Sequence, residues 1–251
     1  MATEVLVPRE SAKVSTGLPG RRYDHLFFSG MALAMLVTVF VGFAQSYYLA
    51  GVFRAPLPSM IIHLHGAAFS CWILLLVAQT SLVAAGRVDI HRRLGVAGFL
   101  LGCLMVVLGV LAATDSLARN GNVPGRDAKA FYIVPLTDVL IFGVLLFFAY
   151  RARRDSPAHK RYIYIATAAL LIAAISRWPW AFAHRNAFRA GLLSYVFLAA
   201  LMAYDFWSTR KIHRSTLWAG AFLIFVGVVR FPVAETAAWH AFAGWVQSVA
   251  R

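Results

Sequence analysis

The sequence predicts an all-α protein, a seven-helix transmembrane bundle with the N-terminus in the cytoplasm and the C-terminus outside. Three observations predict this fold. The chain has 251 residues, of which 61% are hydrophobic and 14% charged, whereas a water-soluble domain carries about 25% charged residues. Apolar runs of about 20 residues recur, which is the length that crosses a bilayer as a helix. Basic residues gather in alternate loops, as they do in multi-span membrane proteins.

Apolar runs bounded by charged residues, proline and glycine define seven spans. We expect them at residues 26–49, 60–85, 94–115, 130–150, 162–183, 188–208 and 215–235. Residues 26–235 thus form the transmembrane domain. Residues 1–25 are expected to be a cytoplasmic tail, because they mix charges and lack the apolar core of a secretory signal. Residues 236–251 are amphipathic and rich in tryptophan, which predicts a segment lying in the membrane interface.

The distribution of Lys and Arg sets the orientation. The tail and the loops after the second, fourth and sixth spans hold 15 of these residues, and the other side holds 7. Because cytoplasmic loops collect positive charge, the first side is cytoplasmic. The same rule explains the net charge of +14 without a nucleic acid partner. We expect a protein of the inner (plasma) membrane in contact with the lipid bilayer, and with either another membrane protein or a second copy of itself.

Polar side chains are expected in the outer third of the bundle, whereas the inner half of the spans is nearly all Ala, Leu, Val, Ile and Phe. Ionisable groups within spans are rare and mark functional sites. The pattern predicts a polar cavity that opens outward. The candidates for ligand binding in it are Gln45, Arg177, Tyr195 and Arg230, and the candidates for metal binding are His65 and Asp138.

Charge pairing is expected within that cavity. A lone buried charge is costly, so Asp138 should pair with Arg177 or with Arg230. Each of these arginines precedes an aromatic residue and a proline, in "RWP" and "RFP". We expect each proline to kink the outer end of its helix and to open room beside the arginine. All four lysines lie outside the expected spans, which excludes a retinal Schiff base.

Four histidines are candidates for cofactor binding. His63 and His65 open the second span in "IIHLHGAA", and on a helix they point about 200° apart, so they cannot both bind one ion. His91 and His159 each open a span beside basic residues, in "HRR" and "HKR". They either anchor the span ends at the lipid headgroups or meet and ligate a metal or haem iron.

The stretch "HLHGAAFSCWILLLVAQTSLVAAGRVDIHRRLG" resembles a pattern in uncharacterised bacterial multi-span membrane proteins. The pattern combines an outer-end histidine with a His-Arg-x-Leu-Gly motif. The stretch is also distantly similar to transmembrane di-haem b-type cytochromes. That resemblance implies an outer haem b on His63 or His65 and an inner one on His91 and His159. Since the outer half has no second intramembrane histidine, a transition metal on His65 and Asp138, or no cofactor, fits the residues equally well.

Three classes of function fit these residues. The first is a redox protein of electron transport with haem or a metal at the outer site. The second is a binder or transporter of a small anion or a lipid headgroup, using Arg177 and Arg230. The third is a non-catalytic component of a larger membrane complex, because small-residue spans allow close helix contacts. The sequence has no nucleophile–base constellation, phosphate loop or protease motif, and it does not decide whether the protein is an enzyme.

Overall fold

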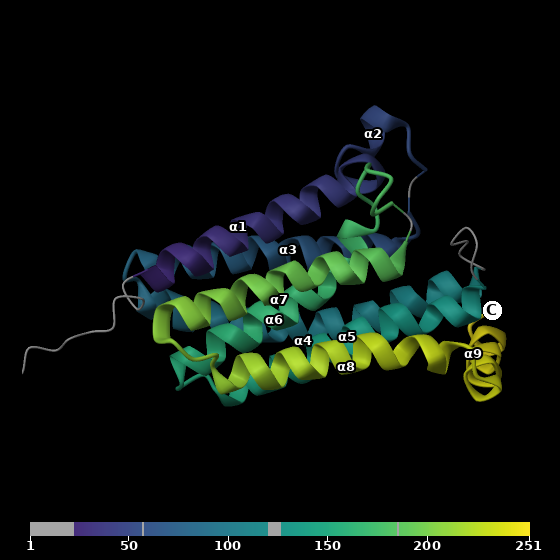
Figure 1. Cartoon of the computed structure of the whole chain (residues 1–251). Helices are drawn as coiled ribbons and strands as arrows, with labels where there is room; N and C mark the ends of the chain where they lie inside the picture. The colour runs from purple at the N-terminus through teal and green to yellow at the C-terminus, as the bar shows by residue number, and fades with distance from the viewer. Residues whose placement is uncertain (1–22, 57, 120–126, 185) are drawn as a thin grey trace, which may run out of the picture.

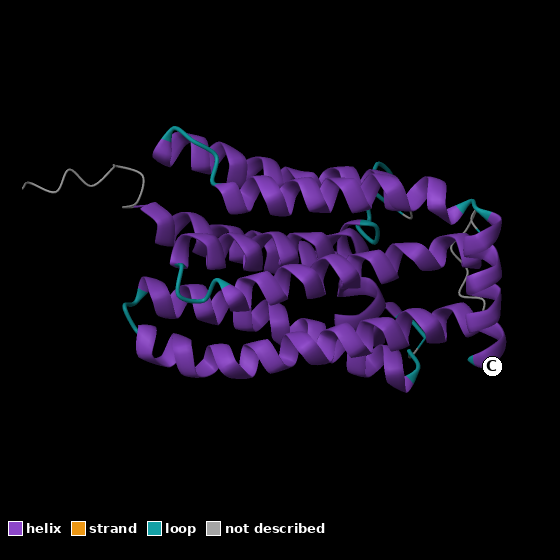
Figure 2. Cartoon of the chain, turned by 90° about the horizontal axis from the view of Figure 1, so that it is seen from below, coloured by secondary structure: helices purple, strands orange, loops and turns teal. Residues whose placement is uncertain are grey.

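The computed structural model describes residues 23–56, 58–119, 127–184 and 186–251. Most of the expected N-terminal tail, residues 1–22, lies outside these residues. Throughout the described part all regular structure is helical (Figure 2). The elements are α1 (Asp24–Phe43), the π-helix η2 (Ala44–Tyr48), α2 (Ala50–Phe53), α3 (Met60–Ala84), α4 (Val88–Ala118), α5 (Ala128–Arg151), α6 (Ser156–Ile175), α7 (Ala187–Thr209), α8 (Arg214–Ala234) and α9 (Ala237–Val249).

Six helices are long and apolar enough to cross a membrane: α1 continued by η2, α3, α4, α5, α7 and α8. The chain is therefore a multi-span helical membrane protein. These helices run side by side, and their connections alternate between the two ends of the bundle (Figure 1). The helix α6 runs in the same bundle but is not among the six. Its first two turns carry His159, Lys160 and Arg161, which lower its apolar character.

The bounds of α6 differ from the expected span 162–183. The helix begins earlier because the Asp155 side chain caps it, accepting a hydrogen bond from the Ala158 N–H at 3.3 Å. The helix ends before Pro179, and the chain then turns through residues 176–184. The prediction that this proline kinks a helix is therefore wrong, since it follows the helix end. Pro232, in contrast, does lie inside the last turn of α8.

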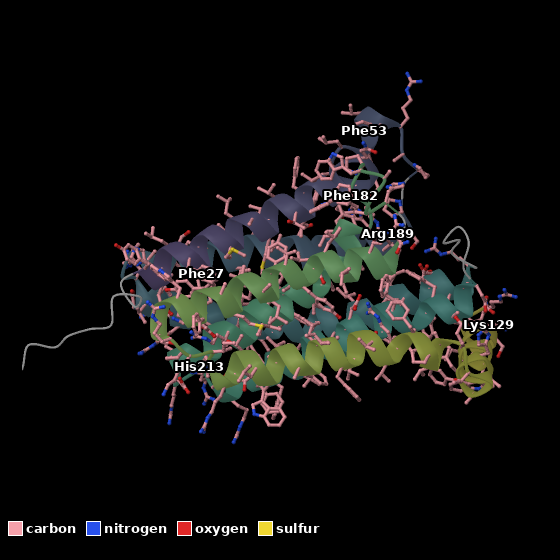
Figure 3. The ribbon with its side chains drawn as sticks, in the orientation of Figure 1. Phe27, Phe53, Lys129, Phe182, Arg189 and His213 are labelled. Carbon is pink, nitrogen blue, oxygen red and sulfur yellow. The ribbon has the colours of Figure 1, made fainter. Side chains whose placement is uncertain are left out.

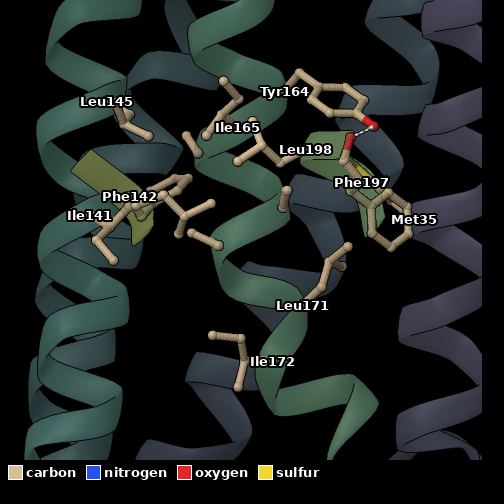
Figure 4. Close-up of a cluster of buried hydrophobic side chains, with 14 of the residues drawn as sticks. Met35, Ile141, Phe142, Leu145, Tyr164, Ile165, Leu171, Ile172, Phe197 and Leu198 are labelled. Atoms are coloured by element: carbon tan, nitrogen blue, oxygen red, sulfur yellow. Dashed lines mark hydrogen bonds between the residues drawn. The ribbon is translucent and has the colours of Figure 1, made fainter. Parts of the chain in front are cut away.

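The helix α6 forms the centre of the core. It packs against α1, α5, α7 and α8, and its Ile165 and Ala166 side chains have no exposed surface. Figure 4 shows Ile165 and Tyr164 among the buried side chains of the neighbouring helices. The Tyr164 hydroxyl donates to the Phe197 carbonyl of α7 at 2.9 Å, which satisfies the one polar atom of that buried side chain.

The segment expected at the interface forms α9, which lies across the ends of the other helices (Figure 1). Hydrogen bonds from its side chains to main-chain carbonyls hold it there. The Trp239 indole N–H donates to the Lys129 carbonyl at 2.8 Å, and the Gln247 amide donates to the Leu117 carbonyl at 2.8 Å. The carbonyls at the end of α4 and the start of α5 thereby gain partners.

Candidate functional site

The bundle has two chemically different ends. At one end α4, α6 and α8 begin, and we call it the basic end. It carries Arg87, Arg92, Arg93, Arg151, Arg153, Arg154, Lys160, Arg161, Arg210, Lys211 and Arg214. Figure 3 labels His213 at this end and Lys129 at the opposite end, which α9 covers.

An ion pair joins α5 and α8 toward the α9 end. The Arg230 guanidinium donates to the Asp138 carboxylate at 2.6 Å, and its Nη1 lies 3.5 Å from the Thr137 hydroxyl. Arg230 is 3% exposed and Asp138 is 8% exposed. The prediction that Asp138 pairs with one of the two arginines is confirmed, and the partner is Arg230.

Tyr195 of α7 completes this group, which we call the α5–α7–α8 cluster: Thr137, Asp138, Tyr195 and Arg230. Tyr195 is half-buried, and the charges of Arg230 and Asp138 act on its hydroxyl. Two glycines make the room. A Cβ at Gly227 would overlap the Tyr195 hydroxyl, and one at Gly191 would lie 3.6 Å from Nη2 of Arg230. Small residues on α7 and α8 thus allow three polar side chains to meet inside the bundle.

One atom of the cluster is left without a partner. The Nε of Arg230 is buried and makes no hydrogen bond within the described residues. A buried donor without a partner costs about 1–3 kcal/mol, and more when it is charged. Such an atom in a folded protein calls for an explanation, for which a bound group is one of the usual answers.

A second buried ion pair lies at the basic end, where the expectation of an apolar inner half is wrong. Arg161 of α6 donates to Asp205 of α7, with Nε 3.0 Å from Oδ1. Asp205 has no exposed surface and Arg161 is 4% exposed. The carboxylate also accepts from the Thr216 hydroxyl at 2.6 Å and from the His213 N–H at 3.1 Å, so it is fully engaged.

A neighbouring group ties α1 to the same end. The Asp24 carboxylate pairs with Lys160 of α6 and accepts from the Tyr204 hydroxyl at 2.6 Å. Neither group follows from the sequence pattern described above. The available signal was an acidic residue near the basic end of each span, in "RRYDH" and in "MAYDFW". An acidic residue inside a membrane span, close to its basic end, needs a cationic partner.

Two of the predicted ligand-binding residues lie elsewhere. Arg177 is exposed just beyond α6, where its guanidinium lies 4.9 Å from the centre of the Phe43 ring and donates to the Ala173 carbonyl at 2.6 Å. Gln45 is exposed on the π-helix η2. No contact between either residue and the α5–α7–α8 cluster is found among the described residues. The structure therefore brings Arg230 and Tyr195 together, but not Arg177 or Gln45.

The histidines of α3 face different neighbours, as their spacing predicts. His63 is exposed, and its Nδ1 lies 3.3 Å from the Tyr47 hydroxyl. His65 packs on the Phe69 ring and against the Leu108 main chain of α4. Its Nδ1 is buried and has no hydrogen-bond partner in the part of the chain that the structure describes. Between His65 and Asp138, the predicted metal ligands, the described part of the chain has no contact.

His91 and His159 meet at the basic end, with ring centres 6.5 Å apart. His91 lies in the first turn of α4 and His159 in the first turn of α6, and α5 lies between these two helices in the sequence. Within the described residues no group of three or more His, Cys, Asp or Glu side chains is placed to hold a metal ion. Any ion at these two histidines would therefore have few protein ligands.

A hollow of about 650 Å³ lies at the α9 end, between α5, α8 and the start of α9. Its apolar wall comes from α5 and α8, and its polar side chains are Asp127, Glu235 and His240. Its lining is Asp127, Ala130, Ile133, Val134, Phe231, Pro232, Ala234, Glu235 and His240. Val134 precedes Asp138 by about one helical turn, and Phe231 follows Arg230 directly, so the hollow is near the ion pair along both helices, although neither Asp138 nor Arg230 lines it.

Comparisons of the chain with protein-family models, curated proteins and solved structures find no match. No relative's activity is therefore carried over to this chain. The similarity to di-haem cytochromes stays a prediction. What the chain's own helices establish is a multi-span membrane protein in contact with the lipid bilayer.

Proposed function

We propose that the protein is a seven-span protein of the inner membrane whose basic end faces the cytoplasm. The seventh span is α6, supported by its 20 residues and its place between α1, α5, α7 and α8. The positive charge of the loops at its start supports the orientation. A reporter that is active only outside the cytoplasm, fused after Arg251, should be active. The same reporter fused after Arg151 should be inactive. The reverse pattern would overturn the orientation.

We propose that the α5–α7–α8 cluster binds a small ligand that enters from the α9 end. The observation that carries this proposal is the buried Nε of Arg230, which has no partner although Arg230 pairs with Asp138. The planar guanidinium can donate from this edge to an oxyanion such as a carboxylate or phosphate. The Tyr195 hydroxyl is close enough for the charge of Arg230 to act on it, and it offers a further donor.

The surroundings favour a zwitterion over a simple anion. Asp138 neutralises the charge of Arg230, and the hollow carries the carboxylates of Glu235 and of Asp127, whose Oδ2 lies 3.4 Å from Nδ1 of His240. On α8, Glu235 is five residues beyond Arg230, which is about 7.5 Å along the axis. A ligand with an acidic group at Arg230 and an amine toward these carboxylates would match both. An amino acid or a phosphoethanolamine headgroup has this chemistry.

Thermal unfolding of the purified full-length protein tests the proposal. We expect the midpoint to rise with phosphoethanolamine and to rise less with phosphate or ethanolamine alone, because binding to the native state stabilises it. Mixed micelles containing phosphatidylethanolamine form a separate arm, which distinguishes a lipid headgroup from a free solute. The Tyr195→Phe variant keeps the ion pair and should weaken the response. The double variant Asp138→Asn with Arg230→Gln should abolish it.

Arg177→Ala is the matched control, since it removes an exposed arginine at the same end. We expect the ligand response of this variant to equal that of the unchanged protein. If Arg177→Ala removes the response and the cluster variants keep it, the binding site lies at α1 and α6 instead. No response to any of these probes in the unchanged protein would overturn the proposal.

A further inference from the structure

The main chain orients the ring of His159 at the basic end, beside His91. The Nδ1 of His159 lies 2.9 Å from the Ala149 carbonyl oxygen at the end of α5. Because a carbonyl only accepts, this nitrogen carries the hydrogen, and in the neutral ring Nε2 keeps a free lone pair. Metal-binding histidines are oriented in this way, with one ring nitrogen held by a carbonyl or carboxylate.

His91 lies against α3, where the Gln79 side-chain amide donates to the His91 carbonyl at 3.3 Å. Among the described residues, neither the buried Nδ1 of His91 nor the buried Oε1 of Gln79 has a hydrogen-bond partner. A histidine that only anchors a span end would turn its polar atoms to water or headgroups. Two buried polar atoms without partners at one place indicate a missing polar or cationic group.

The spacing of the two rings suits one metal ion between them. A zinc–nitrogen bond, taken as a guide, is about 2.0 Å, and the nitrogen lies roughly 1.1 Å from the ring centre, so a linear arrangement separates two ring centres by about 6.2 Å. The observed separation is 6.5 Å, with the rings at 84° to each other. Linear coordination leaves the angle between the ring planes free.

The positive charges around the two rings favour an ion of low charge. Arg92, Arg93 and Lys160 are neighbours in sequence, while the nearby carboxylates are engaged: Asp89 pairs with Arg87, and Asp155 caps α6. The charge of a divalent cation with two neutral ligands would have no nearby free carboxylate among the described residues to balance it. Imidazole suits copper, and singly charged Cu(I) is stable with two nitrogen ligands in line. We propose that His91 and His159 bind one Cu(I) ion, independently of the ligand site at the α5–α7–α8 cluster.

Cu(I) binding to the purified full-length protein under reducing conditions tests this proposal, with a chromogenic Cu(I) chelator as competitor. We expect one Cu(I) per chain. We expect His91→Ala and His159→Ala each to weaken binding by more than about tenfold, since losing only an orienting partner already costs about that much. X-ray absorption should show two nitrogen neighbours. The matched control is His184→Ala. His184 resembles His159 in that its Nδ1 lies 2.9 Å from a main-chain carbonyl, that of Trp178. The His184→Ala variant should bind Cu(I) as tightly as the unchanged protein does.

Thermal unfolding without copper checks that each variant is folded. If an alanine variant fails to fold, His91→Gln and His159→Gln replace it, because glutamine keeps a polar side chain at the site. The proposal is overturned if the unchanged protein binds Cu(I) no more tightly than the double variant. It is also overturned if the two histidines bind Zn(II) in preference, or if the purified protein shows a haem Soret band that either substitution removes.

Discussion

The carboxylate of Asp205 and the guanidinium of Arg161 form a buried pair in which the acid is fully engaged. Besides Arg161, the carboxylate accepts from the Thr216 hydroxyl and the His213 N–H. The Arg161 Nη1 donates to the Pro157 carbonyl at 2.8 Å. Asp138 and Arg230 form the other buried pair, in which the Arg230 Nε has no partner. The Arg161–Asp205 pair therefore suits a structural role that joins α6, α7 and α8. In the Asp138–Arg230 pair, the Arg230 Nε can still donate a hydrogen bond to a ligand.

Breaking the Arg161–Asp205 pair should strongly destabilise the protein. The Arg161→Ala substitution leaves the Asp205 carboxylate buried without its counter-ion, which typically costs about 3–5 kcal/mol. We expect the midpoint of thermal unfolding to fall by roughly 10 °C. The control is Arg153→Ala, which removes an exposed arginine of the same end that lies over the Tyr150 ring. Equal midpoints for the two variants would contradict a structural role for the pair.

Stability should depend on pH through His213, which caps α8. Its Nδ1 accepts from the Ser215 N–H at 3.1 Å, so the ring must be neutral there. Burial lowers the pKa of His213 below 6.5, and the charges of Arg161 and Lys160 act in the same direction, whereas Asp205 and Asp155 oppose them. Because the folded-state pKa is the lower one, this contribution to stability is present above about pH 6.5 and is lost as the pH falls below it.

The His213→Asn variant separates this effect from other titrations. Asparagine keeps a capping acceptor and does not titrate. The thermal unfolding midpoint of each protein is measured from about pH 7.5 to about pH 5.5, because histidine titrates within roughly this range. We expect the midpoint of the unchanged protein to fall more over this range than that of His213→Asn. If the unfolding midpoints of the two proteins change equally with pH, then the titration of His213 does not contribute to stability.

The contact between α1 and α6 requires a glycine at position 42. A Cβ there would overlap the Ala174 carbonyl oxygen and come within 2.8 Å of the Ala174 Cα, and main-chain atoms cannot move aside as a side chain can. Gly42→Ala should therefore destabilise the protein by about 1–3 kcal/mol. Gly30→Ala is the control in the same helix, where a Cβ meets nothing within 4 Å. It should be neutral, or stabilising by up to about 1 kcal/mol, and a similar loss in both variants would refute the close contact.

The sequence predicts much of the fold, because apolar length and loop charge are local properties. Six of the seven expected spans match helices that could cross a membrane. The fifth differs because Asp155 caps α6 before the expected start. Asp205, which is distant in sequence, then pairs with Arg161 and allows this arginine to lie buried inside the helix. The site was predicted in part. The cost of an isolated charge predicted a partner for Asp138, but only the packing of three helices decides that this is Arg230.

Within the described residues, one polar contact joins α3 to α6 in the middle of the core. The Trp72 indole N–H donates to the Thr167 hydroxyl at 3.1 Å, and both side chains are buried. Thr167→Val keeps the shape but leaves that N–H without a partner, so we expect a loss of about 1–3 kcal/mol. Thr80→Val is the control, because the Thr80 hydroxyl only donates to carbonyls of its own helix, as Thr167 also does. Thermal unfolding followed by tryptophan fluorescence measures both variants. A Thr167→Val midpoint no lower than that of Thr80→Val would show that the indole N–H finds another acceptor and that this contact does not hold α3 to α6.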